Sequence, residues 1–180
     1  SVFIESDIKK LKSDYFECNL NVTKNDDSLI MAGCSPCQFY STIKSDKRKA
    51  VKSKDLLMDF ARFVKYYSPG YVLVENVPGI ITNKDSILPQ FLDKLKKIGY
   101  ENIIYKVVDM SHHGIPQSRK RFSLIATRLK NTDIHLPSEN TEITTLDKVI
   151  GEKNGFPKVK AGYQDSSDFN HTVAGLSDKS

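Results

Sequence analysis

An uninterrupted apolar run, Tyr71-Val72-Leu73-Val74, constrains the fold of this chain more than any other feature of its sequence. Apolar residues recur at helical spacing on both sides of the run, over residues 56–67 and 87–98. A short continuous apolar segment between two such helices is typical of a strand buried in a parallel sheet. The alternation of helix and strand therefore predicts an α/β fold with a mostly parallel sheet.

Shorter patterns predict the other elements. Strand-like segments cover residues 2–4, 29–32 and 103–108, and residues 119–126 form another strand if they are extended. Weaker helical patterns cover residues 8–16 and 146–150. From about residue 129 the composition becomes polar and loop-like.

The composition is that of a soluble globular domain. At 180 residues, with 39% hydrophobic and 27% charged residues, the chain is long enough to bury a core. No run approaches the roughly 20 apolar residues of a membrane span, and no signal peptide opens the sequence. Its three cysteines argue against a disulfide scaffold and for a reducing compartment. We therefore expect a cytoplasmic protein without membrane contact.

The positive charge of the chain is concentrated in one segment, residues 44–54. That segment carries as large an excess of positive charge as the whole chain, whose net charge is +5. Its charged residues are Lys44, Lys47, Arg48, Lys49, Lys52 and Lys54, against one acid, Asp46. A run of lysines is usually a solvated loop. Beside a reactive thiol, however, a cationic loop favours a polyanionic substrate such as nucleic acid.

A cysteine-bearing turn, Gly33-Cys34-Ser35-Pro36-Cys37, follows the strand predicted over residues 29–32. A thiolate forms more readily in a polar loop at the end of a strand than in a core, so Cys37 is a candidate nucleophile. Alternatively, Cys34 and Cys37 form a redox pair of the thioredoxin kind, or both thiols merely pack. The cysteines and His112-His113 lack the ligand spacing of a zinc site, so we expect no bound metal.

An acid and two arginines are predicted near the same turn. Glu75, like Cys37, follows an apolar strand, and open α/β sheets bind their ligands at such strand ends. In an extended segment, Arg119 and Arg121 share one face. A thiolate, a carboxylic acid and arginine donors together suit the methylation of a pyrimidine at carbon 5. The thiolate adds at carbon 6, the acid protonates ring nitrogen 3, and arginine holds the carbonyl oxygen.

Three motifs carry a resemblance to a known family. Pro36-Cys37-Gln38, Glu75-Asn76-Val77 and Gln117-Ser118-Arg119-Lys120-Arg121 resemble the Pro-Cys-Gln, Glu-Asn-Val and Gln-x-Arg-x-Arg motifs of DNA cytosine-5 methyltransferases, in their order and spacing. The similarity is densest over residues 29–128, and it extends back to residues 6–8 and loosely forward to residues 145–151 and 170–171. It implies a Rossmann-like, S-adenosylmethionine-dependent methyltransferase domain with helices on both faces of its sheet.

The resemblance also implies a role for each matching residue. Cys37 would be the nucleophile, and Pro36 would shape its turn. Glu75 would contact nitrogen 3 and the amino group of a flipped cytosine, Arg121 would bind its carbonyl oxygen, and Arg119 would lie beside the nucleophile. The implied contacts with S-adenosylmethionine fall to Asp7, Ile8, Pro36 and Leu56. The implied contacts with DNA fall to Gln38, Ser41, Lys44, Lys47, Arg48, Lys49 and Asn76, of which Asn76 would also brace the loop after Glu75.

The sequence departs from the family pattern in two respects. It contains no Gly-x-Gly, the glycine turn of a dinucleotide-type cofactor site, and Cys34 stands where family members often carry glycine or phenylalanine. We therefore expect residues 1–128 to form a partial catalytic domain without its first strand–glycine loop–helix unit. Residues 129–180 would lead toward an absent target-recognition region. Such a chain should bind S-adenosylmethionine poorly and show no turnover by itself.

The resulting hypothesis is a bacterial or phage-like DNA methyltransferase of a restriction-modification system, which binds double-stranded DNA and acts as a monomer. Three alternatives stay open at this point. They are a thioredoxin-like dithiol oxidoreductase, an RNA cytosine methyltransferase of the same fold, and a nucleic-acid-binding domain that has lost turnover.

Overall fold

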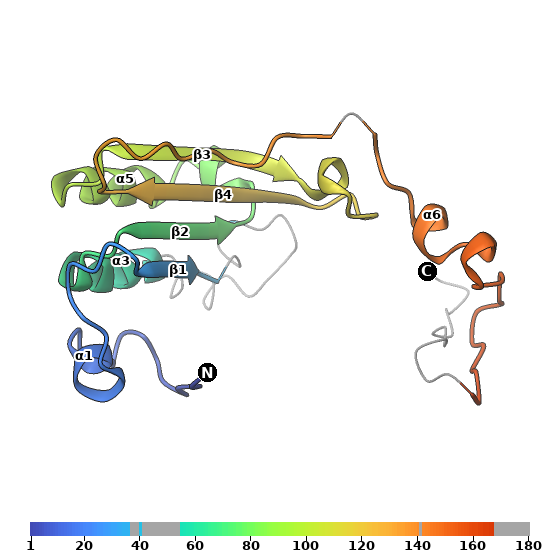
Figure 1. Cartoon of the computed structure of the whole chain (residues 1–180), viewed down its shortest axis with the longest axis horizontal. Helices are drawn as coiled ribbons and strands as arrows, with labels where there is room; N and C mark the ends of the chain where they lie inside the picture. Colours follow the sequence, from blue (N-terminus) through green and yellow to red (C-terminus); the bar gives the residue numbers. More distant parts are fainter. Residues whose placement is uncertain (37–39, 41–54, 141, 168–180) are drawn as a thin grey trace.

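A four-stranded sheet forms the centre of the computed structural model, which describes residues 1–36, 40, 55–140 and 142–167 (Figure 1). The strands are β1 (Ile30–Cys34), β2 (Tyr71–Asn76), β3 (Asn102–Asp109) and β4 (Lys120–Thr127), in the spatial order β1-β2-β4-β3. β1 and β2 are parallel, whereas β4 is antiparallel to both of its neighbours. β1, β2 and β3 therefore run in one direction, but two of the three strand pairs are antiparallel, so the sheet is mixed where a mostly parallel one was expected.

The reversed direction of β4 follows from the short connection that precedes it. Only residues 110–119 separate β3 from β4, and they include a single turn of 3-10 helix, η2 (Met110–His113). A parallel neighbour needs a crossover of roughly a dozen residues or more, whereas an antiparallel one needs only a turn. β4 therefore folds back beside β3 and pairs with β2 on its other side. This arrangement brings the arginine-bearing start of β4 next to the end of β2.

The two long helices lie where the apolar periodicity predicts them. α3 (Leu56–Tyr67) precedes β2 in the chain, and α5 (Leu88–Lys97) lies between β2 and β3. Pro89 stands in the first turn of α5, where its missing N–H costs no helical hydrogen bond. The shorter helices are α1 (Tyr15–Leu20), α4 (Gly79–Thr82), α6 (Leu146–Ile150) and the 3-10 turn η3 (Glu152–Asn154).

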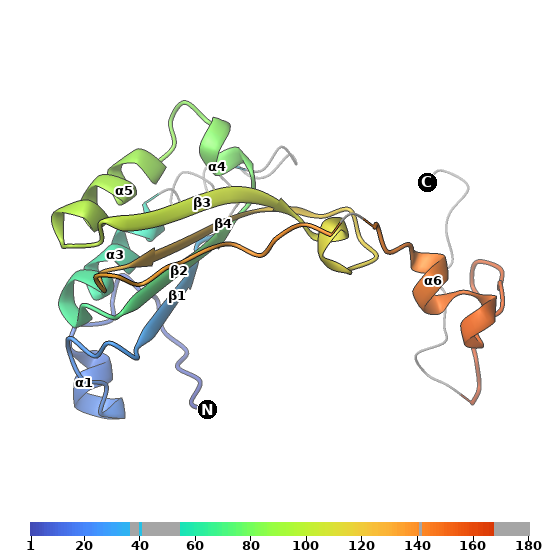
Figure 2. The same ribbon diagram turned by 45° about the horizontal axis from the view of Figure 1, so that its top comes forward.

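The hydrophobic core lies between one face of the sheet and helices α3 and α5 (Figure 2). Burial alternates along β2 and β4, as it does when one face of a sheet is covered. The rings of Phe60 on α3 and Phe91 on α5 stack at a centroid distance of 6.4 Å above this face. Tyr71 and Leu73, which belong to the apolar run, are only half-buried on the opposite face.

An extended segment, residues 129–140, crosses the opposite face of the sheet beneath β3 (Figure 2). Asn102 Nδ2 donates a hydrogen bond to the carbonyl oxygen of Thr132 at 2.9 Å, and Lys106 Nζ lies 3.5 Å from Glu139 Oε1. Helices were expected on both faces. Within the described ranges they pack on one face, because the polar segment after β4 returns in an extended form.

The two ends of the described chain differ from their predicted patterns. Residues 2–4 form no strand in the described structure, because no described strand lies beside them to complete a ladder. The helix predicted over residues 8–16 is replaced by a turn after Asp7 and by α1, which begins at Tyr15. α6 forms where its pattern predicts it and lies away from the sheet with η3 (Figure 1).

Among the helices that the structure describes, none has the length and apolar character that crossing a membrane would require.

Candidate active site

The ends of β1 and β2 place Cys34 and Glu75 side by side. The two residues are partners in the parallel register, and the Cys34 thiol donates a hydrogen bond to Glu75 Oε2 at 2.8 Å. Arg121 approaches from β4, and its Nε lies 2.8 Å from Glu75 Oε1. Both oxygens of the carboxylate are thus held by groups from the two strands that flank β2.

Arg121 reaches Glu75 because β4 lies directly beside β2. Glu75 pairs with Ser123, and Arg121 lies two residues away on the same face of β4. The side chains of Arg121 and Glu75 are 22% and 43% exposed, so a ligand can reach both. An ion pair this accessible adds little to the free energy of unfolding, typically about 0–1 kcal/mol. The pair therefore contributes little to holding the fold together.

The turn before β4 is fixed by Asp109. Its Oδ1 accepts hydrogen bonds from Ser111 N at 3.1 Å and from Ser111 Oγ at 2.8 Å. The hydrogen bond from the Ser111 hydroxyl, with the one from its backbone N–H, holds the pKa of Asp109 below its ordinary value, so this carboxylate stays charged at neutral pH. Arg119 ends the turn, where its carbonyl oxygen accepts from Met110 N at 2.9 Å. Because β4 begins only at Lys120, Arg119 lies outside the strand that carries Arg121.

Asn76 is buried beneath the turn that follows β1, with 2% of its surface exposed. Its Nδ2 donates to the Ser35 carbonyl oxygen at 3.2 Å and to Ser35 Oγ at 3.0 Å. Its Oδ1 accepts from Val77 N at 2.9 Å. Both ends of the amide are used inside the protein. The structure thus places Asn76 in contact with the turn after β1, as the predicted bracing role requires, and its predicted contact with DNA stays a prediction.

One cavity of about 430 Å³ brings together all four residues expected to contact the cofactor. Asp7 and Ile8 line it from the N-terminal segment, Pro36 from the turn after β1, and Leu56 from the start of α3. Cys34 also lines this cavity, so the cavity borders the Glu75 site. Its volume falls within the range of roughly 300–1,000 Å³ that is usual for small-molecule sites.

Arg62, which the sequence analysis did not single out, holds the wall of this cavity in place. From α3 its guanidinium donates to Ser13 Oγ at 2.8 Å and to the carbonyl oxygens of Ile8 and Leu11 at 2.8 and 3.0 Å. These bonds fix the segment that carries Asp7 and Ile8 against α3. The signal in the sequence was an arginine between two apolar residues, Ala61 and Phe63, within a predicted helix.

Replacing Arg62 with alanine should release this wall. Three hydrogen bonds from a charged donor disappear, and we expect the free energy of unfolding to fall by about 1–3 kcal/mol, given the partial exposure of the site. Thermal unfolding of the purified chain measures the change. Lys65→Ala, an exposed position on the same helix, is the matched control and should leave the unfolding temperature nearly unchanged. Equal effects of the two substitutions would contradict the role given to Arg62.

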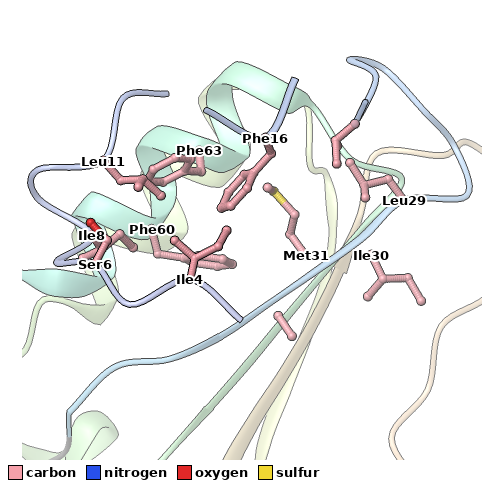
Figure 3. A pocket seen from close by; sticks show the side chains of 12 residues that line it. Ile4, Ser6, Ile8, Leu11, Phe16, Leu29, Ile30, Met31, Phe60 and Phe63 are labelled. Atoms are coloured by element: carbon pink, nitrogen blue, oxygen red, sulfur yellow. The ribbon is translucent and has the colours of Figure 1, made fainter. Parts of the chain in front are cut away.

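A second, apolar cavity of about 390 Å³ adjoins the first (Figure 3). Phe16, Met31 and Phe60 project toward this space, whereas Ile30 points away from it. The cavity lies beside β1, which in the described structure pairs with β2 alone. Ile30 on this strand is 57% exposed. Within the described residues, an unpaired strand edge and an apolar cavity therefore lie together next to the 430 Å³ cavity.

Seven of the predicted site residues lie outside the described residues. They are Cys37, Gln38, Ser41, Lys44, Lys47, Arg48 and Lys49. The structure does describe both flanks of the cysteine segment. Pro36 lines the 430 Å³ cavity, and Tyr40 is buried, with its hydroxyl oxygen accepting a hydrogen bond from Ile87 N at 3.2 Å. Gly79 permits this packing, because a Cβ there would clash with the carbonyl oxygen of Tyr40.

Known proteins resemble this chain over most of its length. The type II methylase M.HgiDII of Herpetosiphon aurantiacus is 32% identical over 151 residues, which cover 83% of this chain and 41% of that protein. The type II methyltransferase M.BsuFI of Bacillus subtilis is 32% identical over 132 residues, which cover 72% of this chain and 32% of that protein. The chain thus spans less than half the length of these curated relatives.

Solved structures agree with the fold. A crystal structure described as a prophage-encoded DNA modification methyltransferase of E. coli has a TM-score of 0.63 and 26% identity, covering 91% of this chain and 44% of that one. The Dnmt2 methyltransferase of S. pombe, at 22% identity and a TM-score of 0.51, covers 71% of this chain and 37% of its own, and it supports the fold alone. The predicted Rossmann-like methyltransferase class is confirmed.

The model of one protein family extends across nearly all of the sequence. It is described as C-5 cytosine-specific DNA methylase and matches residues 2–176. The matched range contains the Cys34–Cys37 segment as well as Glu75 and Arg121. Cys34 and Cys37, the pair on which the thioredoxin-like alternative depends, therefore lie within the matched methylase sequence. The chain belongs to the C-5 cytosine-specific DNA methylase family.

Proposed function

We propose that the protein carrying this chain transfers a methyl group from S-adenosylmethionine to carbon 5 of cytosine in double-stranded DNA. The observation that carries the proposal is the contact between Glu75 Oε1 and Arg121 Nε, 2.8 Å apart at the end of β2. In cytosine the carbonyl oxygen is bonded to carbon 2, the ring atom next to nitrogen 3. Two protein groups that hold them must therefore lie side by side, as Glu75 and Arg121 do.

In the proposed mechanism each residue acts on a defined atom of the base. The Cys37 thiolate adds to carbon 6, while Glu75 delivers a proton to nitrogen 3 and Arg121 stabilises the carbonyl oxygen. Carbon 5 then becomes nucleophilic and accepts the methyl group. Water then takes the proton from carbon 5, which expels the Cys37 thiolate, and nitrogen 3 returns its proton to Glu75, so that the aromatic ring is restored. Asn76 keeps the turn that leads to Cys37 next to Glu75 through its bonds to Ser35.

The residues around the 430 Å³ cavity fit S-adenosylmethionine. Ile8, Pro36 and Leu56 offer apolar surface for a purine ring, and Asp7 offers a carboxylate for polar groups of a nucleoside. When bound, this cofactor supplies an electrophilic methyl group. Arg62 keeps the Asp7–Ile8 side of the cavity in position through its bonds to Ile8 and Leu11.

The wider assignment follows the named relatives. We infer that the complete methyltransferase carrying this chain is the modification enzyme of a type II restriction-modification system and acts as a cytoplasmic monomer. Residues 1–128 would supply part of its catalytic domain. The open edge of β1 and the apolar cavity beside it favour a further strand at this edge, supplied by the part of the relatives' length that this chain does not span.

The choice of methyl acceptor tests the proposal. Genomic DNA from a host without methylation, transfer RNA, and the same genomic sequence copied with 5-methylcytosine are each incubated with the complete methyltransferase and methyl-labelled cofactor. Label should enter only the unmodified DNA, because carbon 5 must carry a hydrogen that can leave. Label in transfer RNA alone would instead assign the RNA activity. If the protein binds DNA but transfers no label, the alternative of a nucleic-acid-binding domain without turnover would be correct.

A further inference from the structure

Cys34 lies where its thiol can control the orientation of Glu75. The two residues are register partners on parallel strands, and Cys34 Sγ lies 2.8 Å from Glu75 Oε2. The strand alternation fixes this direction. Gly33, one residue earlier, faces α3, since a Cβ there would lie 3.0 Å from the Phe60 ring. Cys34 therefore faces the opposite side of the sheet, toward the carboxylate.

We infer that Cys34 is a positioning residue that holds the carboxyl group of Glu75 in the orientation needed to protonate the base, an inference that rests on the proposed role of Glu75. Arg121 holds the other carboxylate oxygen, Oε1, but this arginine is also proposed to bind the carbonyl oxygen of cytosine. When the base enters, Arg121 must share its donors between Glu75 and the base. The Cys34 thiol is not proposed to bind the base, so its hydrogen bond to Oε2 can persist when the base enters.

The chemistry of a thiol suits this position. A thiol is a weak donor and also a weak acceptor, so it can donate to the carboxylate and accept from the carboxylic acid. Glu75 passes between these two states when it gives up its proton. An arginine or lysine in place of Cys34 would instead strongly favour the charged carboxylate of Glu75 and oppose its protonation. Cys34 therefore stays bonded to Glu75 in both states without adding charge.

Steady-state kinetics of the complete methyltransferase test the inference. Cys34→Ala should lower kcat about tenfold, the effect expected for loss of one hydrogen bond to a charged group, and leave the KM for DNA nearly unchanged. Cys34→Ser keeps a donor and an acceptor and should restore kcat to within about threefold of the original. Cys18→Ala, at an exposed cysteine on α1, is the matched control and should have the original kcat. Thermal unfolding of each variant verifies that the fold is intact.

A double-mutant cycle separates positioning from packing. In a Glu75→Gln background, Cys34→Ala should lower kcat no further, because the group it positions has already been removed. Undiminished kcat in Cys34→Ala, or a Cys34→Ser variant as slow as the alanine variant, would overturn the inference. A rise in the KM for the cofactor with unchanged kcat would also overturn it, since it would mark Cys34 as a wall of the cavity only. Normal turnover of Glu75→Gln itself would instead refute the proposed role of Glu75.

Discussion

Replacing Cys37 with serine in the complete methyltransferase should lower methyl transfer to DNA by about 10³-fold or more, as expected for loss of a catalytic nucleophile. A thiol is ionised to a few per cent near pH 7, whereas an alcohol is essentially not ionised there, so serine rarely forms the attacking anion. An alkoxide also leaves the ring poorly once carbon 5 has been methylated. Incorporation of labelled methyl groups into unmethylated DNA measures the loss.

A second measurement tests directly whether Cys37 forms a covalent bond with the base. A duplex with fluorine at carbon 5 of the target cytosine cannot lose that atom as a proton, so the thiolate stays attached after methyl transfer. The original enzyme should yield a complex that survives denaturation, and Cys37→Ser should yield none. Cys18→Ser, at an exposed position on α1, serves as the control and should behave as the original. Normal turnover by Cys37→Ser would end the assignment of the nucleophile.

The Glu75→Gln substitution should produce the second-largest loss, about 10²- to 10⁴-fold in kcat, which is the usual contribution of a general acid. Glutamine keeps the size of the side chain, and its amide oxygen can still accept a hydrogen bond from Arg121 or Cys34. The loss should therefore fall on proton delivery rather than on the fold. Methyl incorporation under saturating DNA and cofactor measures kcat directly.

The matched control for Glu75 is Glu101→Gln, an exposed glutamate beside β3. It should leave both kcat and the unfolding temperature unchanged. Unfolding curves of Glu75→Gln should also nearly overlay those of the original, because the ion pair it removes is partly exposed to solvent. A Glu75→Gln enzyme with normal kcat would show that nitrogen 3 receives its proton from another group.

Much of the fold could be predicted from the sequence, because its signals are local. Apolar spacing alone located α3 at Leu56–Tyr67 and placed α5 within a residue of its ends. The apolar run that begins at Tyr71 became β2, and the polar residues that end it, Glu75 and Asn76, form its last two positions. A helix periodicity or a buried run depends on neighbours a few residues away, and the sequence states these neighbours directly.

The contacts within the site depend on register between distant strands, which no local pattern contains. The sequence placed both Cys34 and Glu75 at strand ends, yet only the parallel register of β1 and β2 makes them partners. The approach of Arg121 needed the reversed direction of β4, and the bonds of Arg62 needed the N-terminal segment to lie on α3. Residues 2–4 show the converse, since an apolar triplet forms no strand without a partner beside it.

In the described structure β1 pairs with β2 alone, so it is an edge strand, and Cys34 stands at its end. Along the far edge of Ile30–Cys34, no strand of the described chain pairs with the main-chain amides and carbonyls. An exposed edge strand of this kind pairs readily with another extended polypeptide, and such pairing is how sheets extend into aggregates. A strand that pairs with this edge should make β1 more rigid along its whole length, up to Cys34 at its end. If Cys34 positions Glu75, we expect its hydrogen bond to pass part of this rigidity on to the Glu75 carboxylate.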